Sequence, residues 1–401
     1  MKDEDLNRPK DLMKLRKSSL DNLVLATGLI LFISILALPD PDSDWDYYDT
    51  VKYASSTLKG HIPFSDFAAM VVGVRALANK TDPYPTLGTA FRDLGIDWDV
   101  RHGSNHPPTS YLLAAPVAFF SWPLASAAWA WLMLALIVLG YRFYGLSWKM
   151  ALGLMPVTLL WPPASASLGQ VTVVWMFGLA LAYRFRKSRL FWSGVSVGLA
   201  SLSKYMPALL MILFLVRRKW RAIAGFATLW VVSLSIVSIL NPAAIPRYVE
   251  ENRHTTIAII ERPDNASPLL VSYRYGGWVG AASLILFLAL VAFVNRRSFS
   301  DGEDFPSTRA WMLLGYFSVA CLPIFWIYSL LPLLPVLIFL LCERKVVTAA
   351  IVLLCLLVPF LFVRGGELYV VLVAGICVLT GLAFMLDVSS LKLLQKRWPS
   401  G

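Results

Sequence analysis

The chain has 401 residues, of which 57% are hydrophobic and only 15% are charged. Because soluble proteins carry roughly 25% charged residues, this composition excludes an ordinary soluble domain and predicts a polytopic membrane protein. The net charge of +11 lies in short clusters between apolar runs. Such clusters are typical of cytoplasmic loops, and the basic stripe of a nucleic-acid-binding protein is missing from the sequence. The clusters occupy residues 14–19, 184–189, 217–221, 295–297, 343–345 and 396–398.

The first predicted element is an apolar run over residues 20–39, which follows a basic segment, 1–19, that we expect to be a cytoplasmic tail. No small-residue cleavage site follows this run, so we expect a retained span and not a signal peptide. Further runs bring the expected number of transmembrane helices to about 12, in one membrane domain over residues 1–401. They occupy residues 123–141, 150–166, 169–184, 190–203, 205–216, 222–240, 277–294, 310–326, 329–342, 346–363 and 370–388.

Two long polar segments, 40–106 and 241–276, separate the runs, and residues 389–401 form a second tail. If both termini are cytoplasmic, all the basic clusters lie inside and both polar segments are loops on the outer face. A short, proline-bounded apolar segment, 107–120, would reverse this order if it crossed the membrane. We therefore expect it to be a re-entrant or interfacial helix on the outer face.

The first outer loop contains a run that begins at Ser65 and Asp66 and stops at Asp82-Pro83. Its apolar residues recur every three or four positions, which predicts an amphipathic helix over residues 66–79 in the outer membrane interface. These apolar residues are Phe67, Met70, Val71, Val74, Leu77 and Ala78. Asp66 has two interpretations: a first-turn carboxylate that the helix dipole stabilises, or a general base held at the membrane surface.

Several motifs follow one another in a particular order along the chain. They are D-F-x(8)-A-L-x(4)-D-P-Y (66–84), HPPTSYLLAAP (106–116), a Gly-Gln span (169–187), a Gly-rich helix with a lysine tip (193–222), DNASPL (264–269) and LPIFWIY (322–328). In this order they resemble glycosyltransferase family 87, integral membrane enzymes of the GT-C fold that include polyprenyl-phosphomannose-dependent α-mannosyltransferases. The sequence departs from the family pattern at Met70, Lys80 and His106, where tyrosine, glycine and an aromatic residue are usual. Tyr328 stands where some members carry a histidine.

The resemblance implies an all-α integral membrane fold of the GT-C type, with the amphipathic helix of the first external loop on its outer face. It also implies an inverting glycosyltransferase that moves a sugar, with mannose as the first expectation, from a polyprenyl-phosphate donor. The acceptor would be a lipid-linked sugar or a glycan at the outer face of the plasma membrane. The lipid-linked donor is a co-substrate, so no cofactor is expected.

A reaction of this kind needs one base for the acceptor hydroxyl and a partner for the phosphate, which is already a good leaving group. Asp66 is the expected base, with a pKa that burial should raise. Lys204 is the expected phosphate partner, although a lysine that snorkels to the interface would look the same. Gln170 is expected to bind a sugar hydroxyl, or otherwise to satisfy groups at a helix end.

Four further residues are candidates for substrate binding, on weaker sequence evidence. Asn265 is assigned to substrate binding by the resemblance alone. Trp326 is expected to stack on a sugar or to anchor the membrane interface. His106 and Tyr328 are expected either to contact a substrate or to have a structural role.

Asp44 and Asp46 belong to an acidic run directly after the first span. They are rival candidates for the essential carboxylate or for a weak cation site, and a solvated loop is the other interpretation. The histidines and the four cysteines show no metal-ligand spacing, so no metal is expected.

Two other functions stay open from the sequence: a transporter or flippase for lipid or glycan, and a catalytically inactive GT-C-like subunit. The spans are nearly free of charge and the polar groups gather at one face, which favours an interfacial enzyme over a transporter.

Overall fold

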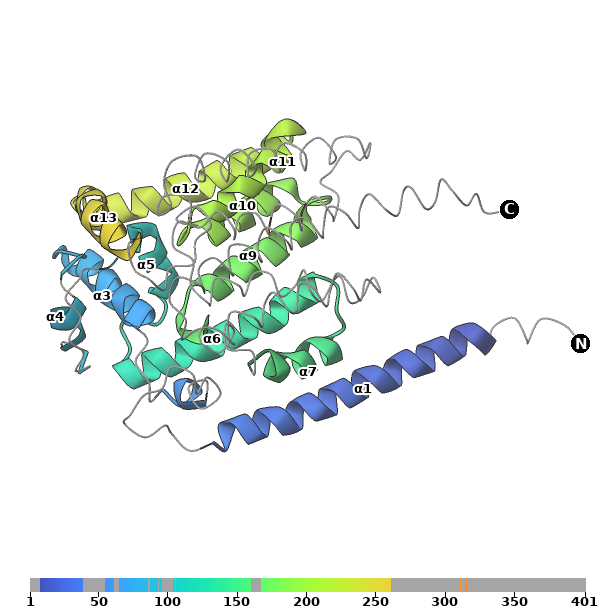
Figure 1. Cartoon of the computed structure of the whole chain (residues 1–401). Helices are drawn as coiled ribbons and strands as arrows, with labels where there is room; N and C mark the ends of the chain where they lie inside the picture. Colours follow the sequence, from blue (N-terminus) through green and yellow to red (C-terminus); the bar gives the residue numbers. More distant parts are fainter. Residues whose placement is uncertain are drawn as a thin grey trace, which may run out of the picture.

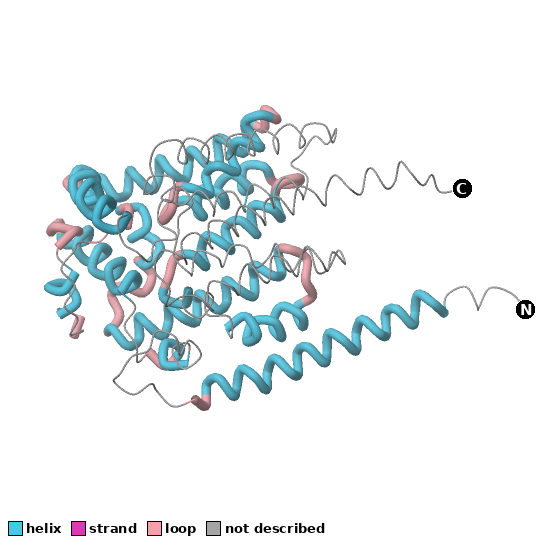
Figure 2. The backbone as a smooth tube through the Cα atoms, viewed as in Figure 1, coloured by secondary structure: helices cyan, strands magenta, loops and turns pink. Residues whose placement is uncertain are grey.

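The computed structural model describes residues 8–38, 55–60, 65–85, 87–92, 94–95, 104, 106–159, 167–260, 311 and 315. Every regular element within these residues is a helix (Figure 2), in agreement with the predicted all-α fold. Helices α6 (Trp122–Phe143) and α12 (Trp220–Leu240) are long and apolar enough to cross a membrane. The expected number of about 12 spans is not established, because the runs that follow residue 276 lie almost wholly outside the described residues.

Six helices form a row in which each packs on the next (Figure 1). The order in the row is α1 (Arg8–Leu36), α7 (Trp148–Leu159), α6, α9 (Thr172–Phe185), α10 (Leu190–Ser201) and α12. Helix α1 begins within the segment that was expected to be a tail, so the apolar run of residues 20–39 continues a helix that starts at Arg8. Helices α9 and α10, of 14 and 12 residues, extend only about 20 Å, less than the roughly 30 Å hydrocarbon core of a membrane.

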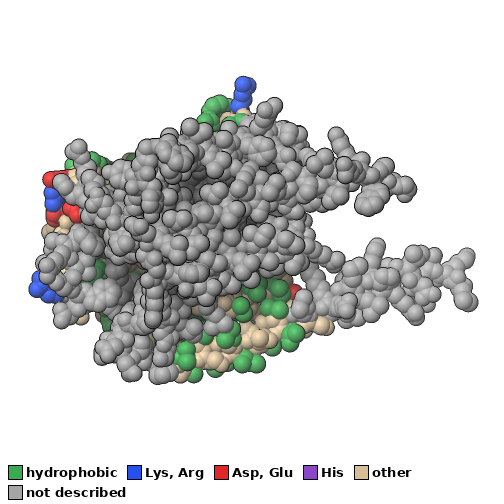
Figure 3. Space-filling model, in the orientation of Figure 1, with side chains coloured by type: hydrophobic (Ala, Val, Ile, Leu, Met, Phe, Trp, Pro, Cys, Tyr) green, Lys and Arg blue, Asp and Glu red, His purple; other side chains and the backbone are tan. Residues whose placement is uncertain are grey.

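Four further helices gather at one end of this row, at the left in Figure 1. They are α3 (Ser65–Asn79), α4 (Leu87–Arg92), α5 (Pro108–Ala114) and α13 (Ala244–Ile260). We call this the polar end, because charged side chains of both signs are visible there in Figure 3. The start of α1 and the turns before α7, α10 and α12 lie at the opposite end. The basic clusters 14–19, 184–189 and 217–221 therefore share that opposite end, as the predicted order of spans requires.

Helix α3 begins and ends close to the predicted positions, but protein covers more of its surface than the amphipathic pattern predicts, and its place in the membrane interface stays a prediction. From Phe67 to Val71 every residue is at most 3% exposed, because α4, α5 and α12 pack around the helix. Ala68 and Ala69 contact Phe91 of α4, while Ala78, expected on the apolar face, is exposed. Helical periodicity identified the large apolar residues but not the protein cover over the alanines.

Helix α3 ends in a strained residue. Lys80 has a φ of 57°, in the left-handed region that a β-carbon disfavours. The N–H of Thr81 donates to the carbonyl oxygen of Ala76 at 3.0 Å, as in a Schellman motif, where glycine is preferred at this position. We expect Lys80→Gly to raise the free energy of unfolding by about 1 kcal/mol, seen as a higher Tm in detergent. A lower Tm would mean that the exposed lysine side chain makes a contact that outweighs the strain.

Helix α5 has seven residues and therefore extends about 10 Å, too short to cross a membrane. The side chains of its first four residues, Pro108 to Tyr111, are buried. The turn that follows is tied to α3, because the Arg75 guanidinium donates to the carbonyl oxygens of Ala118 and Phe120 at 2.9 and 3.0 Å. This agrees with the prediction that the segment does not span.

The contact between α10 and α12 depends on glycine. A β-carbon at Gly194 would stand 1.8 Å from the carbonyl oxygen of Ala222. We expect Gly194→Ala to lower the free energy of unfolding by about 2 kcal/mol or more, because two helix backbones must separate. Thermal unfolding in detergent measures this loss of stability. The control is Gly140→Ala in α6, where the new atom meets only the mobile end of Met176 at 3.1 Å. Equal effects of the two changes would contradict the prediction.

Candidate functional site

Asp66 lies in the first turn of α3, where the helix dipole and free backbone N–H groups favour a carboxylate. The neighbouring Phe67 is buried and stacks on two rings of α6, Trp129 at 4.8 Å and Trp122 at 5.6 Å between ring centroids. These contacts fix the start of α3 against the row. The Asp66 side chain is 28% exposed, so it is held in place while one part of it stays accessible.

His106 faces this carboxylate from the segment that leads into α5. Its Nε2 lies 3.9 Å from Oδ1 of Asp66. The backbone of His106 is held on both sides, since its N–H donates to Ser104 Oγ at 3.2 Å and its carbonyl oxygen accepts from the Tyr84 hydroxyl at 3.0 Å. The backbone that carries the imidazole is therefore held by hydrogen bonds on both sides. The His106 side chain is 9% exposed.

Lys204 lies in the tip between α10 and η2 (Met206–Leu210), a 3-10 turn that leads into α11 (Met211–Val216). This tip is recessed. Trp230, at the middle of α12, donates to Ser201 Oγ at 3.0 Å, so the tip lies about 15 Å below the end of α12. Thr109 of α5 donates to the carbonyl oxygen of Leu202 at 2.8 Å. Helix α5 thus contacts the tip, and Lys204 lies near enough to the start of α3 to influence the Asp66 carboxylate.

Gln170 lies between η1 (Ser167–Gly169) and α9, is 8% exposed, and places its amide beside the Asp66 carboxylate. Within the described part of the chain its Oε1 is buried without a hydrogen-bond partner. The same holds for two other atoms: Thr172 Oγ1, two residues after Gln170, and Ser203 Oγ, directly before Lys204. Buried polar atoms are normally paired, so these atoms are available to a polar ligand.

The charges in the site influence one another. Burial acts to raise the pKa of Asp66, but His106, Lys204 and Gln170 favour the carboxylate and together hold the pKa below its usual range. The expectation that burial would raise this pKa is therefore wrong, because the neighbours outweigh desolvation. Burial lowers the pKa of Lys204 to about 8, although the nearby Asp66 opposes that change. At neutral pH the site holds an anion and a cation.

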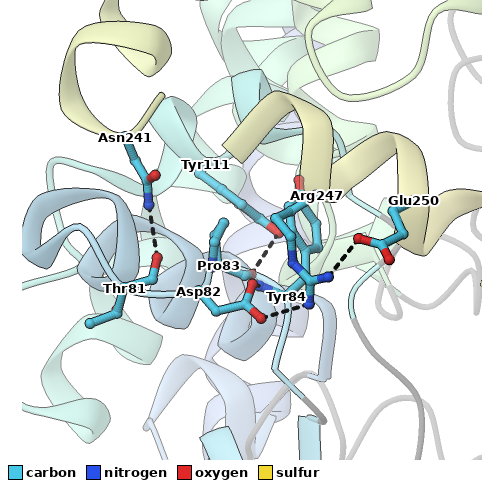
Figure 4. A network of polar contacts seen from close by, with 8 residues as sticks. All are labelled: Thr81, Asp82, Pro83, Tyr84, Tyr111, Asn241, Arg247 and Glu250. Atoms are coloured by element: carbon cyan, nitrogen blue, oxygen red, sulfur yellow. Dashed lines mark hydrogen bonds and ion pairs between the residues drawn. The ribbon is translucent and has the colours of Figure 1, made fainter. Parts of the chain in front are cut away.

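A second polar network connects α13 to the loop after α3 (Figure 4). Arg247 donates to Asp82 Oδ2 at 2.9 Å and to Glu250 at 2.6 Å. Asp82 Oδ1 accepts from the backbone N–H of Tyr84 at 3.0 Å, and Asn241 donates to the carbonyl oxygen of Thr81 at 2.8 Å. This network holds the Asp-Pro-Tyr motif in place, and through the Tyr84 hydroxyl it holds His106.

Sequence reasoning did not assign the partners of this motif. The Asp82 turn has a recognisable signal, since an aspartate followed by proline commonly bonds to its own backbone two residues on. Arg247 and Asn241 have no such signal, because Arg247 lies in α13 and Asn241 directly after α12, both more than 150 residues further along the chain.

Of the site residues predicted from the sequence, the structure brings four together: Asp66, His106, Gln170 and Lys204. Five others lie outside the described residues: Asp44, Asp46, Asn265, Trp326 and Tyr328. In the described part of the chain, no group of three or more histidine, cysteine, aspartate or glutamate side chains is placed to hold a metal ion.

Fold and site together define the class: an all-α membrane protein whose ionised groups meet at one end of a row of apolar helices. The sequence model of Glycosyltransferase family 87 matches residues 105–323, over half of the chain. The chain belongs to glycosyltransferase family 87, and the family suggested by its motifs is confirmed. His106, Gln170 and Lys204 lie within the matched residues, whereas Asp66 precedes them. No curated protein and no solved structure matches the chain.

Proposed function

We propose that this glycosyltransferase moves a sugar, mannose first, from a polyprenyl-phosphate donor to a lipid-linked or glycan acceptor, with inversion at the anomeric carbon. Asp66 takes the proton of the acceptor hydroxyl as its oxygen bonds to the anomeric carbon. The bond from that carbon to the phosphate oxygen breaks at the same time, and its electron pair leaves with the polyprenyl phosphate. Because there is a single displacement, the configuration at the anomeric carbon is inverted.

The observation that carries this proposal is the meeting of Asp66 and Lys204 at the polar end. Each charge shifts the pKa of the other, although the two residues come from elements 138 positions apart in the chain. A base and a cation at short range are the two parts that this displacement needs, since phosphate requires no strong acid to leave. A fixed ammonium stabilises the negative charge on the departing phosphate.

The remaining roles follow from the chemistry of the side chains. Gln170 would hydrogen-bond a hydroxyl of the transferred sugar through its Oε1, which has no hydrogen-bond partner among the described residues. Asn265, Trp326 and Tyr328 remain candidates for substrate contacts, and Asp44 and Asp46 remain rival acidic residues. The recessed position of Lys204 suits a donor whose phosphate enters from the lipid with its polyprenyl chain still in the membrane.

We also propose that the polar end faces away from the cytoplasm, with both termini cytoplasmic in the plasma membrane. The basic clusters at the opposite end support this orientation, because such clusters stay on the cytoplasmic side. Cysteine labelling of whole cells tests it: Cys at exposed Lys80 should react with an impermeant maleimide, and Cys at exposed Trp148 should not.

The function itself is tested with the full chain in lipid nanodiscs. A panel of synthetic farnesyl-phosphate sugars, beginning with mannose and arabinose, is incubated with a glycolipid extract of the native membrane. Mass analysis should find an acceptor heavier by one sugar and free farnesyl phosphate in equal amount. Movement of the donor across vesicle membranes without any new glycosidic bond would instead identify a flippase and reject the proposal.

A further inference from the structure

His106 is the buried titratable group whose arrangement the reaction above leaves without a role. In the described part of the chain its Nε2 is a buried atom without a hydrogen-bond partner, and it lies 3.9 Å from Asp66 Oδ1. A histidine with only a structural role normally pairs both ring nitrogens when it is buried. A nitrogen left unpaired beside a carboxylate is available to receive a proton.

The segment around His106 is built to keep this geometry. Both backbone groups of His106 are hydrogen-bonded, and Tyr84, which holds its carbonyl oxygen, is fixed in turn by Asp82. On the far side, the Tyr111 ring packs so closely on α3 that a β-carbon at Gly73 would lie 2.5 Å from it. These contacts hold the backbone that carries the imidazole in place near α3.

We propose that His106 is the positioning and proton-accepting partner of Asp66, and that it returns Asp66 to the carboxylate after each transfer. This inference rests on the proposed function. Two titratable groups contact His106 in the described part of the chain: the Asp66 carboxylate from α3 and the Tyr84 hydroxyl from the loop after α3.

The proton balance is complete without another reactant. The acceptor O–H bond breaks and its proton goes to Asp66, while the phosphate leaves with the electron pair of the broken glycosidic bond. The protonated Asp66 then gives this proton to the neutral Nε2 of His106. The imidazolium releases it to water, and both side chains return to their starting state. The 3.9 Å separation is longer than a hydrogen bond, as is common in catalytic sites without substrate.

Two variants test the assignment, in nanodiscs with farnesyl-phosphomannose and the native glycolipid extract. His106→Gln keeps a polar side chain of similar size that cannot take a proton. We expect its kcat to fall about 10- to 100-fold, with the KM for the donor unchanged within about threefold.

The second variant, His106→Ala, separates proton transfer from packing. Added imidazole should restore a large part of the lost kcat, in proportion to its neutral form. Pyrazole has nearly the same shape but is a far weaker base, so it should restore little. Equal restoration by both compounds would show that His106 only fills space, and would overturn the inference. So would a His106→Gln variant with the kcat of the unchanged protein.

Failure of this inference is distinct from failure of the proposed function. If the unchanged protein transfers sugar and needs Asp66 but tolerates both His106 variants, only the role of His106 is wrong. If the unchanged protein transfers none of the farnesyl-phosphate sugars, the proposed function is wrong and no statement about His106 survives.

Discussion

Asp66→Asn is expected to lower kcat for sugar transfer by about 10³-fold or more, since a general base contributes typically 10²–10⁴-fold. Asparagine has the size of aspartate and can still accept a hydrogen bond, but it cannot take the acceptor proton. Folding should be retained, because the start of α3 is fixed by the stacking of Phe67 on Trp122 and Trp129. The measurement is single-turnover transfer in nanodiscs with thermal unfolding in parallel.

The pH of this experiment matters, because Asp66 supports the charge of Lys204. Removal of the carboxylate lowers the pKa of Lys204 further below 8, so the assay is best run near pH 6.5, where the ammonium stays protonated. A matched control is Asp21→Asn, at the opposite end, which keeps an acceptor for the Ser147 hydroxyl. Normal turnover in Asp66→Asn would reject Asp66 as the base and turn attention to Asp44 and Asp46.

Lys204→Gln is expected to raise the KM for the polyprenyl-phosphate donor by roughly 10- to 150-fold, with a smaller effect on the acceptor. The magnitude follows from the loss of a charged hydrogen bond to phosphate, worth about 1.5–3 kcal/mol. Donor titration at fixed acceptor concentration measures it. Lys149→Gln removes a lysine from the opposite end, where its ammonium donates to Asn22, and should leave the KM unchanged.

The pH dependence of donor binding provides a second test of Lys204. Because burial lowers the pKa of Lys204 to about 8, its protonated fraction falls from about nine-tenths at pH 7 to about one-tenth at pH 9. The KM for the donor should therefore rise through this range in the unchanged protein. Lys204→Arg stays charged and should lose this dependence. A KM independent of pH in the unchanged protein would remove Lys204 from the phosphate site.

The charge of Lys204 and the pKa of Asp66 are coupled, which a purely structural lysine would not produce. Lys204 helps to hold the pKa of Asp66 low. Replacing Lys204 by glutamine should therefore raise the pKa of Asp66 and move the acid side of the kcat profile to higher pH. An unchanged acid side would mean that the two charges do not meet in the working enzyme.

The sequence by itself determined the class of the fold and the identity of the candidate site residues. Apolar runs and their lengths predicted α6 and α12 closely, because a run of some 20 apolar residues has few alternatives to a membrane helix. The start of α3 at Ser65 and its end near Asp82-Pro83 followed from local rules for helix termini. Asp66, Gln170 and Lys204 were selected from short motifs whose order matched a family.

Only the tertiary structure decided how these residues meet. It buried the first half of α3 under neighbouring helices, recessed the Lys204 tip below the end of α12, and placed His106 and Lys204 near Asp66. The pKa of Asp66 was predicted in the wrong direction for this reason: desolvation can be anticipated for one residue, but the opposing effect of three neighbours depends on their distances. Contacts between segments distant in the chain, such as Arg247 with Asp82, arise from packing that no local pattern encodes.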